Sequence, residues 1–299
     1  MSSPCIVGFH ESVLAPTLAK ALDVPHQKLY PTLFSDGEFA LPKIQLTGID
    51  HVIFVVDFLC AGNELIHVEL LAVTLLLRQL VQQGVARVTL VMPYLPYDRA
   101  DRLDETPMAL VLDQLGRFTS GCLITLDVHK ELDQQPLVLS YKTDMLWHKL
   151  AESLAAKDDL VVVSPDHGGI GRAKRLAQLL DVPFGIMAKQ RNDFGDVHMH
   201  SLTSDVSGKT VLLRDDMVDT GKTAAEAVAM LKQQGATRVF GLFTHPILSQ
   251  GAEVRLQQAA FEGIFFTNSL IKVPLPFAKV IQLDGLLTEA LLQHLQQII

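Results

Sequence analysis

The segment from Val211 to Gly235 constrains the fold more than any other part of the chain, because it reads in succession as strand, loop and helix. The apolar run VLL leads through two acids into the turn DTGKT, and the helix-period sequence AAEAVAMLKQQG ends at a glycine. The backbone N–H groups that begin such a helix point outward with the positive end of the helix dipole. A loop at this place therefore suits a phosphate.

The polar residues of this loop indicate what else it binds. Gly221 lets the backbone close around an anion, and the hydroxyls of Thr220 and Thr223 can donate hydrogen bonds. Three acids close to this anion site carry negative charge: Asp215, Asp216 and Asp219. Sugar hydroxyls or a magnesium ion would give these acids a partner. The alternative is an ordinary strand-to-helix turn capped by Asp and Thr, but capping needs fewer acids.

Apolar strand-like runs alternate with helix-period segments along all 299 residues, which predicts parallel sheets covered by helices. The fold class is therefore α/β, with two similar domains that each carry a mostly parallel β-sheet flanked by helices, in a pseudo-duplicated arrangement. We expect residues 1–145 to form the first domain and residues 146–283 the second. The helix expected at 284–299 can pack back on the first domain.

The composition excludes several classes of protein. A net charge of -8 and a pI of 5.7 argue against binding to nucleic acid or to an anionic membrane, because both need clustered Lys and Arg. The 3 cysteines are widely spaced and fit reduced thiols better than a disulfide frame or a zinc site. The beginning MSSPCIVGFHES lacks a signal-peptide pattern, and the apolar run ELLAVTLLLRQLV is too short and too charged to span a bilayer. We expect a soluble cytoplasmic protein.

Further loops carry residues that could do chemistry, and each also has a simpler interpretation. FSDGEFALPKIQ predicts a hairpin around Asp36-Gly37, and PYLPYDRADRLDETP follows a strand with charges that could be solvated. His129 ends the strand LITLDVH, where a histidine is more often a cap or a core residue than a ligand. DHGGIGR indicates a second anion-binding loop, and Lys189 and Arg191 follow an apolar run as the expected cations of a mobile loop.

Six segments, in order, resemble motifs of the ribose-phosphate diphosphokinase (phosphoribosyl pyrophosphate synthetase) family, a relative of type I phosphoribosyltransferases. FSDGEF resembles its adenine-contacting loop, PYLPYDRADR its PYxxYxRQDR segment and LDVH its DLH. SPDHGGIGRAKRLA resembles its pyrophosphate loop, KQR its KxR catalytic loop and DDMVDTGKT its ribose 5-phosphate loop. The DTGKT turn alone looks more like purine phosphoribosyltransferases, which share only that motif well.

The resemblance implies a role for each matching residue. ATP contacts are implied at Phe34, Asp36, Glu38, Arg99 and Asp101, the first three supplied across a subunit interface. Magnesium is implied at His129 and Asp166, and catalytic neutralisation of the transferring group at Lys189 and Arg191. A pyrophosphate loop is implied at Asp166, His167, Gly168 and Gly169. A ribose 5-phosphate loop is implied at Asp215, Asp216, Asp219, Thr220, Gly221, Lys222 and Thr223. Ala100 departs from the family, which usually has Gln there.

The implied reaction is the magnesium-dependent transfer of the diphosphoryl group of ATP to the anomeric hydroxyl of ribose 5-phosphate. It gives phosphoribosyl diphosphate and AMP, and it needs positioning and charge neutralisation rather than a covalent nucleophile. The resemblance also implies a homo-oligomer, at least a dimer. Two alternatives stay open from the sequence: a phosphoribosyltransferase of the purine type, and a catalytically silent regulatory relative.

Overall fold

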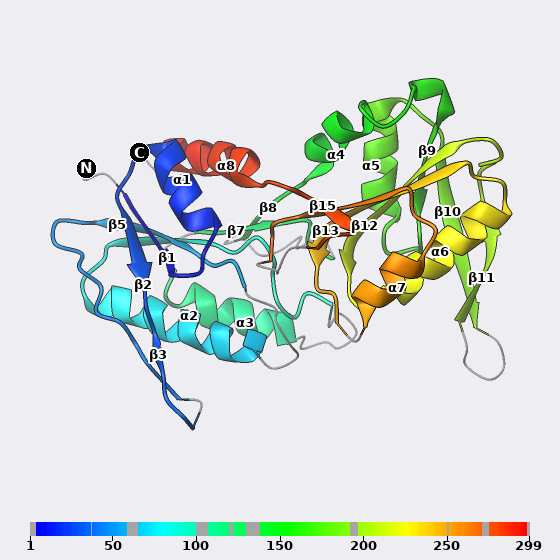
Figure 1. Ribbon diagram of the computed structural model, residues 1–299. Helices are drawn as coiled ribbons and strands as arrows, with labels where there is room; N and C mark the ends of the chain where they lie inside the picture. The colour runs from blue at the N-terminus through cyan, green and yellow to red at the C-terminus, as the bar shows by residue number, and fades with distance from the viewer. Residues whose placement is uncertain are drawn as a thin grey trace. The chain divides into compact units, whose positions relative to one another are not determined.

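The structure, a computed structural model, describes residues 4–36, 38–58, 65–99, 107–119, 122–129, 138–191, 197–249, 251–270 and 275–297. The chain divides into two compact units (Figure 1). Unit 1 contains Met1–Tyr141, Ser269–Lys272 and Gln282–Ile299, and unit 2 contains Lys142–Asn268 and Val273–Ile281. The domain boundary expected between residues 145 and 146 stays a prediction about which segments fold independently.

Unit 1 is built on a six-stranded sheet in which neighbouring strands run parallel. The strand order is β2 (His26–Leu29), β1 (Cys5–Phe9), β5 (His51–Val55), β6 (Arg87–Val91), β7 (Cys122–Leu126) and β8 (Val138–Tyr141). Every residue of β5 and β7 is buried, as expected for strands covered on both faces. A short hairpin of β3 (Thr32–Leu33) and β4 (Phe39–Ala40) follows β2 and leads away from this sheet (Figure 1).

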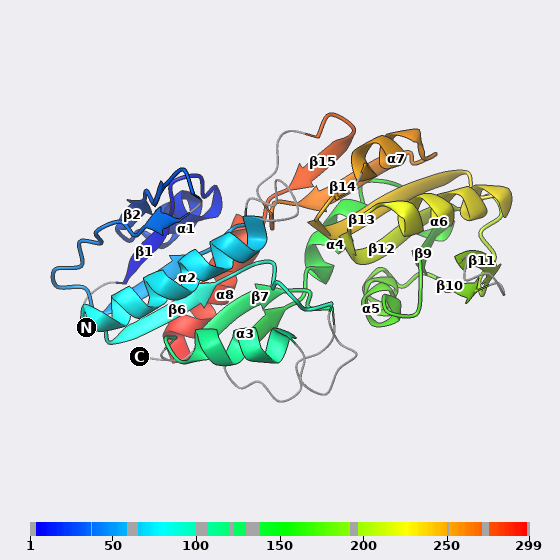
Figure 2. The same ribbon diagram turned by 90° about the horizontal axis from the view of Figure 1, so that it is seen from below.

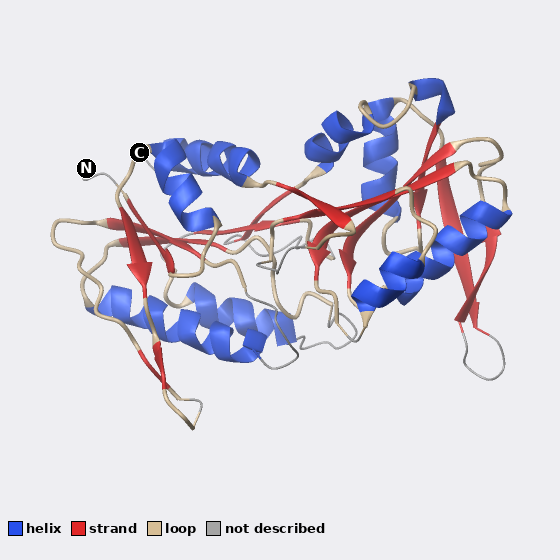
Figure 3. Ribbon diagram, viewed as in Figure 1, coloured by secondary structure: helices blue, strands red, loops and turns tan. Residues whose placement is uncertain are grey.

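Helices cover both faces of this sheet. α1 (Leu14–Leu22) and α8 (Asp284–Gln297) lie on one face, whereas α2 (Leu65–Gln82) and α3 (Pro107–Gly116) lie on the other (Figure 3). The view from below shows α2 and α3 in front of the strands and α8 behind them (Figure 2). α8 packs against α1 and buries its apolar side chains, among them Leu287 and Leu291.

A buried polar chain also ties α8 to the sheet. His51 Nε2 on β5 lies 2.9 Å from the hydroxyl of Thr89 on β6, and that hydroxyl lies 3.2 Å from His294 Nε2 on α8. All three side chains are buried. Burial and the positive charge of Arg87 lower the pKa of both histidines, that of His51 to about 4.

Unit 2 is built on a second sheet of the same design. Its strand order is β11 (Val197–Leu202), β10 (Phe184–Arg191), β9 (Leu160–Ser164), β12 (Thr210–Val218), β13 (Arg238–Pro246), β14 (Gly263–Thr267) and β15 (Ala278–Ile281). Neighbours from β10 to β15 run parallel, and β11 is antiparallel to β10. The two parallel α/β sheets confirm the predicted fold class.

The structure corrects one expectation about this sheet. The segment that carries Lys189 and Arg191 was expected as a mobile loop, but both residues belong to β10. β11 pairs with this extension and aligns Lys189 with Met199 and Arg191 with Val197. The expectation was wrong because the partner strand, VHMHSL, comes later in the chain and its hydrogen bonds extend β10.

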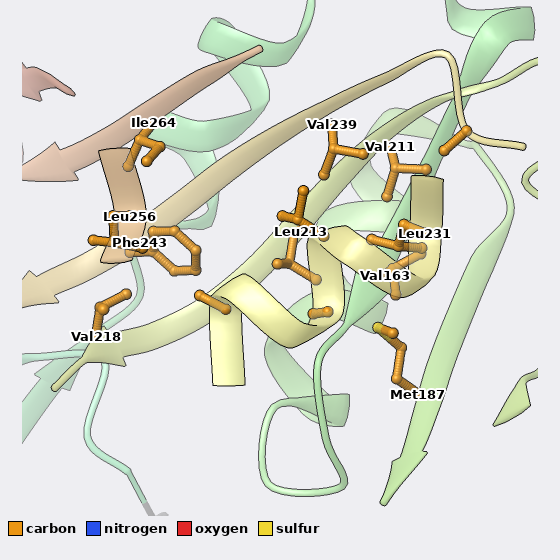
Figure 4. Packing of buried hydrophobic residues seen from close by; sticks show 14 of the residues in the cluster. Val163, Met187, Val211, Leu213, Val218, Leu231, Val239, Phe243, Leu256 and Ile264 are labelled. Carbon is orange, nitrogen blue, oxygen red and sulfur yellow. The ribbon is translucent and has the colours of Figure 1, made fainter. Parts of the chain in front are cut away.

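Two helices on each face bury the core of unit 2. On one face, α6 (Lys222–Gln233) and α7 (Ala252–Gln258) pack on side chains of the central strands, and Figure 4 shows Val163, Val211 and Leu213 facing Leu231 of α6. On the other face, α4 (Asp144–Ala151) and α5 (Ile170–Leu180) pack around Trp147 and Leu212. None of the described helices has both the length and the apolar character that crossing a membrane requires.

Candidate active site

The two expected anion loops of unit 2 meet at the centre of its sheet. β9 leads through α5 to β10 on one side, whereas β12 leads through α6 to β13 on the other, so the strand order reverses between β9 and β12. Ligands of open α/β sheets bind at such a reversal, beyond the carboxyl ends of the strands. The loop Asp166–Gly169 and the acids of β12 lie at this place.

The loop after β9 is held by its own polar groups. Ser164 Oγ donates to the carbonyl of Asp166 at 2.7 Å, and the N–H of Gly169 donates to Asp166 Oδ1 at 3.2 Å. A β-carbon on Gly169 would lie 2.5 Å from Ser164 Oγ and 3.3 Å from Asp215 Oδ1. A β-carbon here would displace Ser164 Oγ from its place in the loop and crowd Asp215, so a glycine fits this position best.

Arg172, on the first turn of α5, joins the two loops. Its guanidinium donates to the carbonyl of Gly168 at 3.1 Å, and it lies 3.5 Å from Asp215 Oδ1 and 3.1 Å from Asp216 Oδ2. The Arg172 side chain is only 6% exposed and that of Asp216 2%, whereas that of Asp215 is 16% exposed. Asp215 is thus the more accessible acid of the pair, and Asp216 faces inward.

The surroundings of Asp215 favour its protonated form. Burial raises its pKa well above the usual range, and the negative charges of Asp216 and Asp166 raise it further, while Arg172 opposes the shift. Asp215 and Asp216 therefore share one guanidinium, that of Arg172, and the negative charge of Asp166 acts on Asp215 as well. A cation or hydroxyl donors arriving at this place would relieve the repulsion between these acids.

The turn after β12 is fixed by α7 and by the segment that precedes it. Ser249 Oγ donates to Asp219 Oδ1, the N–H of Ser249 donates to the Asp219 carbonyl at 3.0 Å, and Arg255 donates to the carbonyl of Thr220. Gly221 has φ 73°, and a β-carbon there would lie 3.3 Å from Leu256 Cγ. This conformation puts a glycine at the N-cap of α6, and the N–H groups of a helix start suit an anion.

Lys222 and Thr223 follow in the first turn of α6. The Lys222 side chain is 66% exposed and its Nζ lies 3.8 Å from Glu226 Oε1 along the helix. The N–H of Lys222 donates to Thr220 Oγ1 at 3.5 Å, and Thr223 is half-buried. Lys222 therefore has a partner on its own helix surface.

In unit 1 the structure brings the loop that carries Arg99 next to His129, through Asp98. Asp98 is buried, and its carboxylate accepts the backbone N–H of His129, so the loop after β6 meets the end of β7. Tyr97 has φ 65°, and its hydroxyl lies 2.6 Å from His67 Nδ1 on α2. Arg99, next to Asp98, is exposed at this edge. Asp101 and Ala100 lie outside the described residues.

The expected adenine contacts lie on the β3–β4 hairpin, as the sequence predicted. The N–H of Phe34 donates to the carbonyl of Glu38 at 2.7 Å, and the N–H of Glu38 donates to Asp36 Oδ1 at 3.0 Å. Phe34 is 50% exposed, which is unusual for a phenylalanine, and Asp36 and Glu38 are also exposed. The hairpin tip presents an uncovered aromatic ring flanked by two acids.

Lys189 and Arg191 are placed by their backbone, and their side chains lie outside what the structure describes. β10 pairs with β9 on one side, so its far end runs past the carboxyl end of β9. The two alternate positions share a face of the strand. The strand therefore carries both residues beyond the point where β9 gives way to the Asp166 loop.

The donor set fits a hard cation only in part. Among the described residues, no group of three His, Cys, Asp or Glu side chains forms a ready metal cage. Magnesium commonly uses one or two carboxylates and completes its shell with water and substrate phosphates, and the carboxylates beside Asp215 provide such oxygens. Of the two expected ligands, His129 belongs to unit 1 and Asp166 to unit 2.

Three residues that fix these loops were not expected from the sequence. They are Arg172, Ser249 and Arg255. They contact the acids and the turn, but none of them stands at a position that was expected to bind a ligand. Arg172 had a signal, since a helix residue three or four positions after a glycine loop points back over that loop. Ser249 and Arg255 had none, because the segment around α7 reaches the turn only through tertiary packing.

Two sheets with this topology, and paired loops at the reversal of the second sheet, define a protein of the phosphoribosyltransferase class. Residues 129–243 match the profile described as "Phosphoribosyl transferase domain", and residues 5–114 match "N-terminal domain of ribose phosphate pyrophosphokinase". With the ribose-phosphate pyrophosphokinase of Thermosipho africanus the chain is 32% identical over 272 residues, which cover 87% of this chain and 84% of that one.

Two further relatives cover still more of the chain. The putative ribose-phosphate pyrophosphokinase 2 of Lactiplantibacillus plantarum is 30% identical over 95% of this chain and 91% of its own. The crystal structure of phosphoribosylpyrophosphate synthetase from Mycobacterium smegmatis superimposes with a TM-score of 0.82 at 28% identity, covering 99% of this chain and 100% of that one. The chain belongs to the ribose-phosphate pyrophosphokinase family, and it is an enzyme of that type. A purine phosphoribosyltransferase and a silent relative are not favoured.

Proposed function

We propose that the described loops carry out magnesium-dependent diphosphoryl transfer from ATP to ribose 5-phosphate. The observation that supports this most is the convergence of the Asp166 loop and the Asp215 loop on Arg172 at the sheet reversal of unit 2. One loop offers two glycines at the start of α5, which suit a pyrophosphate, and the other offers acids and the start of α6, which suit a phosphorylated sugar.

Ribose 5-phosphate is held by the loop after β12 in this proposal. The backbone around Gly221 and the hydroxyls of Thr220 and Thr223 surround the 5-phosphate, and Asp215 and Asp219 accept hydrogen bonds from the ribose hydroxyls. Asp216 supports them from behind through its contact with Arg172. Lys222 is exposed beside Glu226 and contributes little to the affinity.

The reaction itself needs the donor phosphates and the anomeric hydroxyl in line. The hydroxyl oxygen attacks the β-phosphorus and gives up its proton, the bond from that phosphorus to the oxygen it shares with the α-phosphate breaks, and AMP leaves with that oxygen. Lys189 and Arg191 neutralise the charge that spreads over the transferring group, and the loop Asp166–Gly169 cradles the product diphosphate. Magnesium, held by His129 and Asp166, would supply further charge neutralisation at the phosphates.

The ATP donor is contacted by Arg99 and Asp101 and, from a neighbouring copy of the chain, by Phe34, Asp36 and Glu38. The exposed ring of Phe34 supports this, because an uncovered aromatic surface on a projecting hairpin suits stacking on a base. The proposed enzyme is therefore a homo-oligomer of at least two subunits, located in the cytoplasm.

A direct assay tests the proposal. Purified protein is incubated with ATP, ribose 5-phosphate and magnesium, and AMP and phosphoribosyl diphosphate are measured together. Equal amounts of the two products are expected, and none when ribose 5-phosphate or the metal is omitted. Release of AMP without phosphoribosyl diphosphate would contradict the proposal.

A further inference from the structure

Arg214 is a buried cation that the proposed reaction does not use. It lies on β12 directly before Asp215, and it is 0% exposed, which is rare for an arginine. Its side chain extends toward the α4 face of unit 2, where its Cζ lies 5.3 Å from the centre of the Trp147 ring. Burying a guanidinium costs free energy that hydrogen bonds must offset, and its two terminal nitrogens, Nη1 and Nη2, both donate to acceptors within unit 2.

The acceptors of Arg214 lie on β12, on β13 and at the residue before α4. One nitrogen, Nη1, donates to the main-chain carbonyl of Asp215 and lies 3.4 Å from the carbonyl of Leu242 on β13. The other, Nη2, donates to Thr143 Oγ1 at 3.0 Å. Arg214 thus forms a hydrogen bond with the carbonyl of the peptide that links Asp215 to Asp216.

The N–H group of that same peptide is held by the Asp215 side chain. The N–H of Asp216 donates to Asp215 Oδ1 at 2.9 Å, and the N–H of Met217 donates to Asp216 Oδ1 at 2.9 Å. Arg172 meets the two carboxylates from α5. The direction of the Asp215 carboxylate therefore depends on the orientation of one peptide plane, and Arg214 fixes the carbonyl of that plane.

We infer that Arg214 is a positioning residue for the ribose-binding acids, and that it connects them to Trp147 through Thr143. This inference rests on the proposed function. The indole Nε1 of Trp147 donates to Thr143 Oγ1 at 2.7 Å, the same oxygen that accepts from Arg214. Because Trp147 is the only tryptophan of the 299 residues, its fluorescence reports the state of this chain of contacts.

The first experiment compares the affinities of Arg214→Met and wild type for two substrates by calorimetric titration. Methionine keeps most of the length and removes every donor, so the dissociation constant for ribose 5-phosphate should rise about tenfold or more, as for a lost hydrogen bond to a charged group. The affinity for ATP should stay unchanged. If Arg214 had a purely structural role, its replacement would lower the affinity for both substrates together. Arg214→Lys, which keeps one cationic donor, should recover part of the ribose 5-phosphate affinity.

Arg238→Met is the control for the loss of an arginine beside the other end of β12, where the side chain is 41% exposed. Arg238 also lies over an aromatic ring, 4.8 Å from the centre of Phe240, and also donates to a main-chain carbonyl, that of Leu154 at 3.0 Å. It pairs with Thr210 at the amino end of β12, away from the acids. Its removal should leave ribose 5-phosphate affinity at the wild-type value. An equal loss in both variants would overturn the inference.

The second experiment follows Trp147 emission in the wild type. Saturating ribose 5-phosphate should change the intensity or wavelength, and Arg214→Met should show no such change at its own saturation. The wild-type measurement tests the inference even if Arg214→Met does not fold. Trp147 emission that ribose 5-phosphate leaves unchanged would overturn the inference. Equal ribose 5-phosphate affinity in wild type and Arg214→Met would overturn it as well and leave the proposed function intact. No binding of ribose 5-phosphate by wild type would overturn both.

Discussion

Gly221 begins α6 with a positive φ of 73°, and its position makes the anion loop of unit 2 sensitive to a single side chain. A valine there would meet Leu256 Cγ and the carbonyl of Ala252, which a β-carbon would approach to 3.3 and 3.4 Å. We expect Gly221→Val to abolish calorimetric binding of ribose 5-phosphate, because the branched side chain would push the turn away from α7 and displace the backbone proposed to surround the phosphate.

Gly208 provides the control for backbone strain. It has φ 72°, and a β-carbon there would meet nothing within 4 Å. It lies before β12, at the opposite end of the strand from the acids. Gly208→Val should cost stability of a similar kind, measured as a lower Tm, but keep ribose 5-phosphate affinity. Unchanged affinity in Gly221→Val would mean that the turn is only structural.

Asp215 should make the stability of unit 2 fall with rising pH. Its pKa is raised in the folded protein by burial and by the charges of Asp216 and Asp166. Unfolding therefore releases a proton from Asp215 between its ordinary pKa of about 3.9 and its raised value. The contribution of this group is largest below that window and is lost as the pH rises through it. Asp215→Asn should show a smaller fall of Tm across that window than wild type, and an equal fall would contradict the role of this acid.

Lys189 and Arg191 are expected to act on the rate more than on affinity. Replacing either residue by alanine should lower kcat about a hundredfold or more, the scale for one preorganised donor to a transition state, with a much smaller change in KM. Steady-state kinetics measure both. Lys209→Ala, which removes an exposed lysine that donates to the carbonyl of Asp158, should keep wild-type kcat. If the Lys189 and Arg191 variants kept near wild-type turnover, these two residues would be solvated charges without a role in the transition state.

Much of the site was predictable residue by residue, because the acids, glycines and hydroxyls of a ligand loop are chosen for their own chemistry. The loop positions of Asp166, Gly169 and Gly221 follow from this. The buried arginines do not. Beyond the spacing of Arg172 from the glycine loop, no local pattern shows that Arg172 or Arg214 is buried, because their partners come from distant segments of the folded unit.

At the scale of elements, α8 is held to unit 1 by apolar packing and by the contacts of His294 with Thr89 and, through it, His51. The pKa of both histidines is lowered in the fold, that of His51 from 6.5 to about 4. The unfolded chain therefore binds more protons below pH 6.5, and the stability contributed by neutral His51 is lost as the pH falls from 6.5 toward 4.

Glutamine at position 51 or 294 keeps a polar group near Thr89 and removes the titration. His51→Gln and His294→Gln should each show a smaller drop of Tm between pH 6.5 and 4 than wild type. Hydrogen exchange should show that α8 opens at higher pH in wild type than in either variant. His10→Gln, at an exposed position of the same unit, is the control. If both variants keep the full drop, the histidines are not its source.

Long strands and helices of the central layers were predicted well, because continuous apolar runs and helix periods are strong local signals. The edges were not. β11 and β15 are short or polar strands at opposite ends of the unit 2 sheet, and they exist because a neighbouring strand offers them free backbone groups. β2, at the edge of the unit 1 sheet, has the same character.

For the molecule as a whole, the proposed ATP site predicts an active form with at least two copies of the chain. Sedimentation velocity at the concentration of the activity assay should show a dimer or a larger species. Phe34→Ala should raise the KM for ATP while leaving the sedimentation coefficient unchanged, because the ring is exposed rather than part of the core. An active monomer would contradict the prediction.

The composition of unit 1 from separated segments also has a consequence for how the protein is made. Met1–Tyr141 supplies the sheet, but α8, whose apolar side chains cover one of its faces, follows the whole of unit 2 in the chain. During synthesis a ribosome releases that sheet with α1 in place but the part of the face that α8 covers still bare, while Lys142–Asn268 can already collapse around its own core. The nascent sheet would then be the stage at which a holding chaperone is most useful, and slowing translation beyond residue 281 would lengthen that exposure.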